Sequence, residues 1–280
     1  MILPFVILFV VFYVASIKWI CHRYNRTFLM SGLKLLFNDR RHQMGFRDVN
    51  EVSLPPDSVR ALVVIAHPDD ECMFFAPSIL TLLKQNASVH LLCLSSGNYY
   101  NQGVQRKNEL FDSAAVLGIP ASRVSVIEHK ELQDDPKADW SISLTSSLIL
   151  KHIQIHAINA VLTFDGRGVS GHANHIVIYK AFNHLAVTGK IPHSCHVLCL
   201  DTISVFRKYL SILELPISWL IPSDLCCISG PKEYNQAKRA MFCHRSQLLW
   251  FRHLYIFFSR YMFVNTFQAI PLHRKDIKVY

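Results

Sequence analysis

The sequence lacks the patterns by which several classes of protein are recognised. It contains no internal repeat and no low-complexity segment, so a solenoid or a biased disordered chain is not indicated. It also contains no zinc-knuckle, helix-turn-helix or RNP-like motif. A basic chain without such motifs has little to mark it as a nucleic-acid-binding protein, which leaves anionic lipids or acidic substrates as partners for its charge.

The sequence also lacks the cysteine spacing of a disulfide framework. The eight cysteines are scattered along the chain, and Cys93 and Cys199 lie inside apolar runs typical of buried strands. Cys195 and Cys199 have the spacing C-x3-C, but no second pair completes a metal cage. The cysteines therefore indicate reduced core residues and a reducing compartment rather than a disulfide framework.

Acidic residues are fewer than basic ones. With 29 Lys and Arg against 20 Asp and Glu, the 280-residue chain carries a net charge of +9. The excess lies at the two ends: residues 18–60 hold eight basic and four acidic side chains, and residues 231–280 hold nine and two. The nearly neutral middle is typical of one globular domain of catalytic size, flanked by basic segments.

The first 17 residues, MILPFVILFVVFYVASI, contain no charge. Continued to Ile20, the segment reaches about the length that crosses a bilayer core. It has neither the basic start nor the cleavage site of a signal peptide, and a helix that is apolar all round is hard to bury in a soluble core. Because Lys18, Arg23 and Arg26 follow it, the positive-inside rule predicts a transmembrane anchor with the rest of the chain on the cytosolic side.

The paired prolines of SLPPDS, residues 53–58, indicate where a folded domain begins. We expect a transmembrane anchor at residues 1–20, a basic juxtamembrane linker at 21–59, a catalytic domain at 60–265 and a C-terminal tail at 266–280.

Within the domain, apolar β-rich runs alternate with amphipathic stretches. The runs predict strands at residues 61–66, 88–95, 123–128, 159–164 and 195–201. The stretches predict helices at residues 77–85, 104–117, 141–156 and 173–187. The alternation predicts an α/β fold, with a Rossmann-like, mostly parallel sheet that has helices on both faces.

Two segments rich in histidine and acid follow predicted strands. The first strand ends in AHPDDE, residues 66–71, and the fourth is followed by GHANH, residues 171–175. Loops beyond the carboxyl ends of parallel strands gather at one edge of a sheet, so we expect these segments to meet there. Two histidines and an aspartate can hold a catalytic metal with an open position for water, and a neighbouring carboxylate can take that water's proton.

Each segment also has a simpler interpretation. An Asp-Asp-Glu run is commonly the solvated start of a helix, where carboxylates favour the amino-terminal dipole. The histidines of GHANH could cap the following helix, and Arg106 in QRKNEL is by default a surface residue of a helix. The expected meeting of the two segments at one edge favours a metal site over these alternatives.

Together the segments resemble the LmbE-like, or PIG-L, zinc de-N-acetylase family. AHPDDE followed about 100 residues later by GHANH is similar to its pattern. Further segments resemble its eukaryotic members: GNYYNQG, TFDGRGVSGHANHI, RKYLSILELP and CHRSQLLWFRHLYIFFSRYM. The resemblance covers approximately residues 60–265.

The resemblance implies a role for each matching residue. His67, Asp70 and His175 match the family's metal ligands, for zinc or another divalent transition metal. Asp69 matches its general base.

Two further matches concern the substrate. His172 matches the histidine that stabilises the oxyanion. Many bacterial relatives have an acid where this chain has Asn174, which leaves the charge state of His172 open. Arg106 matches an arginine near the substrate, and the fork of its guanidinium suits a sugar phosphate.

The activity implied by the resemblance is removal of the acetyl group from N-acetylglucosaminyl-phosphatidylinositol, giving glucosaminyl-phosphatidylinositol and acetate. This is the second step in the synthesis of glycosylphosphatidylinositol (GPI) anchors. A single-pass protein of the endoplasmic reticulum membrane, with a cytosolic catalytic domain, is implied as well. The alternatives are a related deacetylase of a soluble N-acetylglucosaminide and a non-catalytic membrane adaptor that retains the fold.

A second membrane signal lies near the C-terminus. Residues 244–262, HRSQLLWFRHLYIFFSRYM, have the pattern of an aromatic amphipathic helix in which Arg245, Arg252 and Arg260 recur at seven and eight residues. Such a helix suits either the headgroup layer of a membrane or the core of the domain, and a lipid substrate favours the membrane surface.

Overall fold

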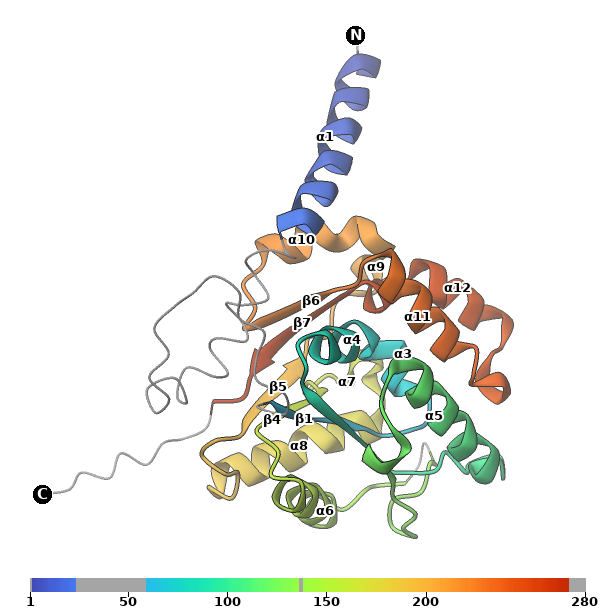
Figure 1. The fold of residues 1–280 in the computed structure, drawn as a ribbon, viewed down its shortest axis with the longest axis vertical. Helices are drawn as coiled ribbons and strands as arrows, with labels where there is room; N and C mark the ends of the chain where they lie inside the picture. The colour runs from blue at the N-terminus through green and yellow to red at the C-terminus, as the bar shows by residue number, and fades with distance from the viewer. Residues whose placement is uncertain (1, 24–58, 136–137, 272–280) are drawn as a thin grey trace, which may run out of the picture.

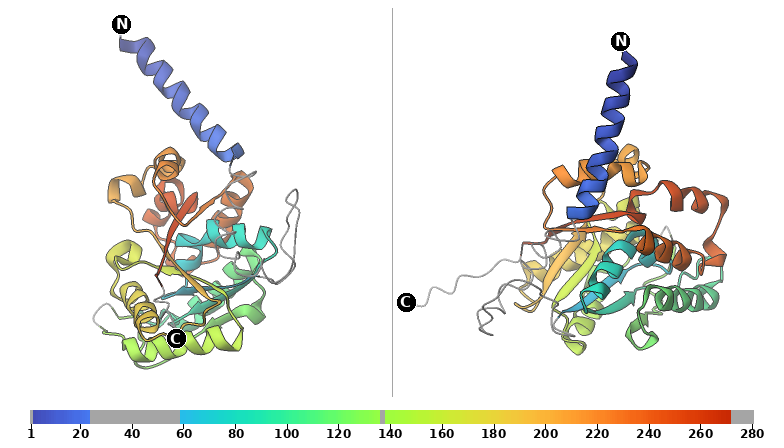
Figure 2. Two further views of the ribbon diagram at one scale, coloured as in Figure 1. Left: turned by 90° about the vertical axis from the view of Figure 1, so that its left-hand side faces the viewer. Right: turned by 45° about the horizontal axis from the view of Figure 1, so that its top comes forward.

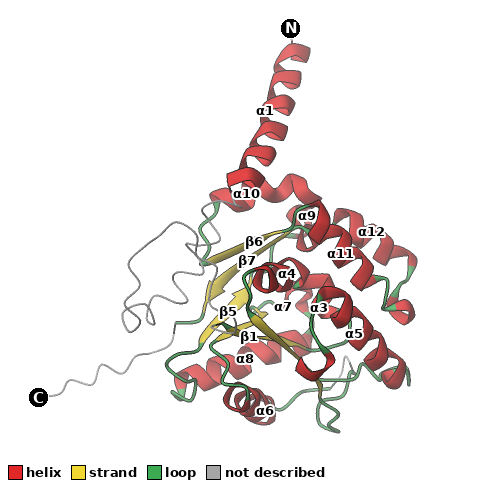
Figure 3. Ribbon diagram, in the orientation of Figure 1, coloured by secondary structure: helices red, strands yellow, loops and turns green. Residues whose placement is uncertain are grey.

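A seven-stranded sheet forms the centre of the folded domain (Figures 1 and 3). The computed structural model describes residues 2–23, 59–135 and 138–271. The strands are β1 (Arg60–Ile65), β2 (Ser88–Cys93), β3 (Val124–Val126), β4 (Ala160–Phe164), β5 (His196–Leu200), β6 (Leu225–Ile228) and β7 (Val264–Ala269). They lie in the order β3-β2-β1-β4-β5-β7-β6; β1 to β5 run parallel, and β7 runs antiparallel to both of its neighbours.

Helices cover both faces of this sheet (Figure 2). The helices of the domain are α3 (Asp70–Phe74), α4 (Ala76–Lys84), α5 (Gly103–Leu117), α6 (Ile142–Ile155), α7 (Gly168–Gly171), α8 (Ala173–Val187), α9 (Val205–Lys208), α10 (Leu215–Leu220), α11 (Pro231–Met241) and α12 (Trp250–Phe258). On one face α8 packs against β1 and β4, and α6 packs against α8. On the other face α4 packs against β2, β6 and β7, while α11 packs against α4 and α5.

The predicted fold class is confirmed. The five predicted strands and four predicted helices are all present, with ends within two residues of those expected. These strands could be predicted from the sequence because they are buried on both faces and therefore consist of nearly continuous apolar residues. Every residue of β4 is buried, and in β1 only Arg60 is partly exposed.

The antiparallel edge of the sheet was not predicted. β6 has four residues, LCCI, and β7 has the mixed sequence VNTFQA, so neither gives a long apolar run. β7 lies between β5 and β6 and continues to Ala269, past residue 265, the predicted end of the catalytic domain.

Helix α1 (Ile2–Arg23) projects from the domain beside α10 (Figure 1). Its stretch Pro4–Arg23 is long and apolar enough to cross a membrane, and only 6% of its most apolar window is buried. The C-terminal end of the helix is anchored: Ile20 packs in a small cluster with Leu215 and Val264. Most of the linker predicted after it lies outside the described residues.

The segment predicted as one basic, aromatic helix is divided in three. Two 3-10 turns, Arg245–Gln247 and Arg260–Met262, flank the nine-residue helix α12. Its arginines do not form an exposed stripe, because Arg260 is completely buried. The Nε of Arg260 donates to Glu214 at 2.8 Å and its Nη2 donates to the Thr266 hydroxyl at 2.9 Å.

Replacing Arg260 by Met should lower the free energy of unfolding by about 3 kcal/mol, because Glu214 would lose its buried partner. Arg207 also pairs with Glu214 but is partly exposed, so Arg207→Met should cost about 1 kcal/mol or less. Denaturation of the detergent-solubilised variants would measure both. Equal losses would show that burial does not set the importance of Arg260.

Candidate active site

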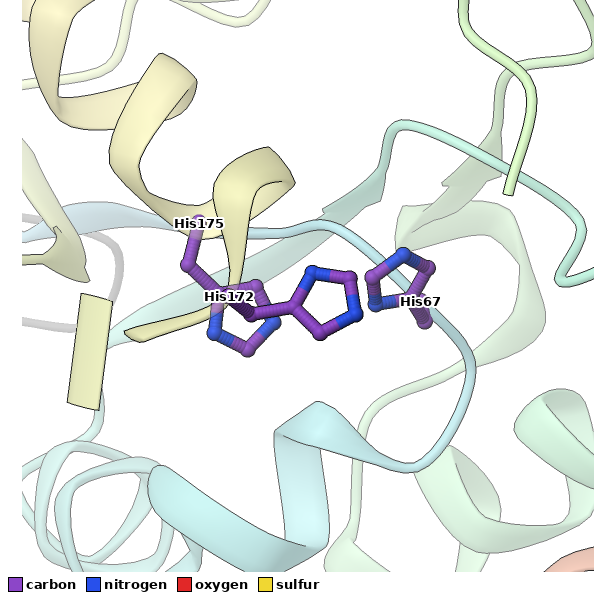
Figure 4. Close-up of side chains that lie close together, drawn as sticks. All are labelled: His67, His172 and His175. Atoms are coloured by element: carbon purple, nitrogen blue, oxygen red, sulfur yellow. The ribbon is translucent and has the colours of Figure 1, made fainter. Parts of the chain in front are cut away.

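The two predicted segments meet beyond the carboxyl ends of β1 and β4. His67 follows β1, and the pair His172 and His175 follows β4 at the start of α8. Figure 4 shows the three imidazoles side by side, and a nitrogen from each lies within 4.8 Å of the others. The expectation from parallel-sheet topology is therefore confirmed.

The carboxylate of Asp70 lies between two of these histidines. Its Oδ2 is 3.2 Å from His175 Nε2 and 3.7 Å from His67 Nδ1. Ligands of a tetrahedral zinc site, about 2.1 Å from the metal, lie about 3.4 Å from one another. Asp70 Oδ2 is fixed at this place because it also accepts hydrogen bonds from the backbone N–H groups of Ala66 (3.1 Å) and His67 (2.9 Å).

The tautomer of His175 also suits a metal ligand. Its Nδ1 lies 3.0 Å from the Gly168 carbonyl, which can only accept, so Nδ1 carries the proton. The buried Nε2 makes no hydrogen bond and faces Asp70. The ring stacks on Phe164 with centroids 3.8 Å apart, which fixes its orientation. His67, Asp70 and His175 therefore fit a divalent metal.

The charges of this group favour a cation. Burial alone would raise the pKa of Asp70, but His175 and His67 outweigh it and hold that pKa well below its usual range. Burial lowers the pKa of His67, but the hydrogen bond with Asp134 and the neighbouring carboxylates outweigh it and raise the pKa. A metal ion would supply the positive charge that these surroundings favour.

Asp69 is buried but is not a helix cap of the usual kind. It precedes α3 with φ 113° and makes no side-chain cap hydrogen bond, so its backbone is strained for a residue with a side chain. Its carboxylate lies 3.1 Å from Arg252 Nη2 and 3.9 Å from Arg106 Nη2. Burial raises the pKa of Asp69, and the charge of Asp70 adds to this against the two arginines. A raised pKa makes the carboxylate a better proton acceptor near neutral pH.

Glu71 holds Asp69 in that conformation. Its Oε2 accepts from the Asp69 backbone N–H at 3.1 Å, and its Oε1 accepts from Ser113 (2.5 Å) and lies 2.7 Å from His244 Nε2. Burial would raise the pKa of Glu71, but His244 outweighs it and lowers the pKa. Glu71, Cys72 and His244 also form a cluster of metal-type ligands. Because Glu71 is already hydrogen-bonded, we interpret the cluster as a support for Asp69.

His172 lies beside the proposed metal ligands His67 and His175. It is half-buried and does not cap α8 through its side chain, contrary to the simpler interpretation of GHANH. Burial and the charges of His67 and His175 lower its pKa to about 4, so the imidazole is neutral at physiological pH. Asn174 does not pair with it: the Asn174 amide nitrogen is 3.0 Å from His67 Nε2.

Arg106 is buried, so the surface interpretation of this helical arginine is wrong. Its guanidinium donates to the carbonyls of Gly97 (3.1 Å) and Pro68 (2.8 Å) and to Asp134 at 3.0 Å. A Cβ at Gly97 would lie 2.5 Å from the Arg106 guanidinium carbon, and Gly97 has φ +71°. Arg106 thus joins the loops that follow β1, β2 and β3.

The glycines before the second motif allow its close packing. Residues 166–171, GRGVSG, have the spacing G-x-G-x-x-G that also occurs in dinucleotide-binding loops. Here Gly168 has φ +62°, and a Cβ on it would lie 3.0 Å from the Cβ of His175. The glycine is thus explained by the approach of α7 to α8, which places the histidines.

A cavity of about 780 Å³ opens over this group. The residues predicted from the sequence line it, and we call them the floor: His67, Asp69, Asp70, Arg106, His172 and His175. A wall of the cavity comes from α9 and α12 and includes Lys208, Tyr209, Trp250, Phe251, Arg252, Leu254, Tyr255 and Phe258.

Several residues of the site were missed by the sequence analysis. Asp134, which lies 3.1 Å from His67 Nε2, follows no recognised motif, although the acidic segment ELQDDP marks its place. Arg252 and His244 lie in the segment interpreted as a membrane helix. Their contacts with Asp69 and Glu71 span more than 170 residues, so no local pattern reveals them.

Comparisons with known proteins agree with this geometry. A family described as "PIG-L: GlcNAc-PI de-N-acetylase" matches residues 62–186. The chain is 49% identical to the N-acetylglucosaminyl-phosphatidylinositol de-N-acetylase of Bos taurus over 216 residues, which cover 77% of this chain and 85% of that protein. It is 36% identical to a probable enzyme of the same name from Schizosaccharomyces pombe, with 73% and 84% covered.

The chain belongs to the PIG-L family of de-N-acetylases. Solved structures share its fold. An N,N'-diacetylchitobiose deacetylase from Pyrococcus horikoshii matches with a TM-score of 0.56 at 16% identity, over 85% of this chain and 92% of that one. A deacetylase of the A40926 pseudoaglycone matches with a TM-score of 0.54 at 13% identity, over 78% and 100%. The family's motifs thus lie on its expected fold, and its deacetylases are metal-dependent.

Proposed function

We propose that this PIG-L family member hydrolyses the N-acetyl group of N-acetylglucosaminyl-phosphatidylinositol, giving glucosaminyl-phosphatidylinositol and acetate in the second step of GPI-anchor synthesis. The observation that carries the proposal is the arrangement of Asp69, Asp70, His67 and His175 at the floor of one cavity, in a chain 49% identical to an enzyme of that name. An adaptor without catalysis would not need a buried general base held in a strained conformation.

His67, Asp70 and His175 would hold zinc or another divalent transition metal, because their nitrogen and oxygen donors are those of catalytic zinc sites. When bound, it would polarise the acetyl carbonyl and lower the pKa of a water molecule. The buried Asp69 carboxylate accepts the proton of that water, and its raised pKa favours the transfer. The neutral His172 ring donates a hydrogen bond to the oxygen on which negative charge develops.

Arg106 supports this chemistry from the cavity floor. By donating to the Pro68 carbonyl it holds the loop that carries Asp69. Its contact with a sugar phosphate stays a prediction. Two of its N–H groups already donate to the Gly97 carbonyl and to Asp134.

The lipid part of the substrate matches the other end of the cavity. The cavity wall formed by α9 and α12 includes exposed apolar side chains, namely Trp250, Phe251, Leu254 and Phe258. Leu220 on α10 is also exposed, and Figure 1 shows α10 beside the base of α1. We propose that α1 spans the endoplasmic reticulum membrane once, that the domain is cytosolic, and that this apolar surface rests on the bilayer.

Two substitutions separate base chemistry from metal binding. Asp69→Asn should keep the metal content and reduce acetate release about a hundredfold or more, because the proton acceptor is lost. His175→Ala should reduce the metal content itself. Metal analysis and acetate release from N-acetylglucosaminyl-phosphatidylinositol measure both effects, with the exposed Asp112→Asn and His184→Ala as controls. Full activity of Asp69→Asn, or unchanged metal in His175→Ala, would contradict the respective assignment.

Trp250, which is 75% exposed beside the cavity, reports on membrane contact. In vesicles that contain the full chain, lipids brominated near the headgroup should quench the part of the tryptophan fluorescence that is lost in a Trp250→Phe variant. The comparison with this variant removes the signal of the other three tryptophans. Unquenched Trp250 fluorescence would mean that this wall of the cavity faces water rather than lipid.

A further inference from the structure

Three cations line the cavity, and two of them already have carboxylate partners. Arg106 is hydrogen-bonded to Asp134, and Arg252 is hydrogen-bonded to Asp69. Lys208, the last residue of α9, differs from both: among the residues that the structure describes, no carboxylate pairs with its ammonium group. Its close neighbours are the rings of Tyr209 and Tyr255, whose centroids lie 5.7 Å and 5.8 Å from Nζ.

The position of Lys208 is unfavourable for a charge without a partner. The residue is half-buried, and burial together with the positive charge of Arg252 lowers its pKa. The Nε of Arg252 is itself buried and has no hydrogen-bond partner. Two cations with unused donors on one cavity wall repel each other, and an anion bound between them would relieve the repulsion and satisfy the donors.

The place of Lys208 along the cavity indicates which anion this is. Its chain neighbour Tyr209 is 47% exposed and lines the same wall as the exposed Trp250 and Phe258, whereas Arg252 reaches from that wall to Asp69 on the floor. Lys208 also lies close enough to Arg252 for their charges to interact, and we therefore place it between the exposed part of the wall and the reacting end. In a phosphatidylinositol glycolipid, the phosphodiester lies between the acyl chains and the inositol that carries the amino sugar.

We propose that Lys208 Nζ and Arg252 Nε form a binding site for the phosphodiester of the lipid substrate. The inference rests on the proposed function and adds to it a residue outside the matched family segment 62–186. Lys208 here acts in substrate binding and touches none of the reacting atoms. With this site, the enzyme binds the phospholipid more tightly than a sugar without phosphate.

A kinetic test compares two substrates that differ in the phosphate. For the full chain in detergent, Lys208→Met should raise the KM for N-acetylglucosaminyl-phosphatidylinositol about tenfold more than the KM for N-acetylglucosaminyl-inositol, as expected for one lost hydrogen bond between charged groups. The effect should lie in KM rather than kcat, and Lys208→Arg should restore most of the affinity. Lys180→Met, at an exposed position of α8, is the matched control. Equal changes for both substrates, or no change, would overturn the proposal.

A binding test separates this proposal from that of deacetylation. Titration of the full chain with glycerophosphoinositol should give a dissociation constant about tenfold weaker in Lys208→Met, whether or not the preparation is active. Binding that depends on Lys208 in a protein without deacetylase activity would contradict the proposed reaction alone. Binding unaffected by the substitution would overturn the phosphodiester site, as would equally tight binding of inorganic phosphate.

Discussion

The contact on which the site depends is the one between the Asp70 carboxylate and the two loops it joins. The backbone N–H groups of Ala66 and His67 fix this carboxylate at the end of β1. From there it faces His175, which comes from the start of α8 more than 100 residues later in the chain. A buried carboxylate with this many donors is costly to protonate, so the loops are held together by a charge that suits a metal ligand.

Around this contact, the site is divided into a rigid floor and an amphiphilic wall. The floor is built on strand ends and on the Glu71 network, which fixes the strained backbone of Asp69. The wall carries Lys208 and Arg252 next to exposed aromatic residues. Chemistry on a small acetamide needs a precise floor, whereas capture of a glycolipid needs a surface that meets water, phosphate and acyl chains within one cavity.

The sequence allowed the parallel part of the sheet and the two motifs of the site to be predicted, because both depend on local signals. Buried parallel strands such as β4 are continuous apolar runs, and the ligands follow two of these strands directly. The wall could not be predicted, because its residues act through distant contacts. Arg252 and Arg260 have the spacing of a basic stripe, yet one reaches Asp69 and the other is buried against Glu214. Helical spacing predicts which residues share a face but not what that face contacts.

The central claim is that this floor is a metal-dependent amidohydrolase site for a phosphatidylinositol glycolipid. The most direct measurement is acetate release from N-acetylglucosaminyl-phosphatidylinositol by the detergent-solubilised full chain, before chelation, after chelation and after zinc is added back. We expect release to stop on chelation and to return with zinc. A folded, zinc-loaded protein that releases no acetate from this lipid, or one that works equally well without metal, would contradict the account.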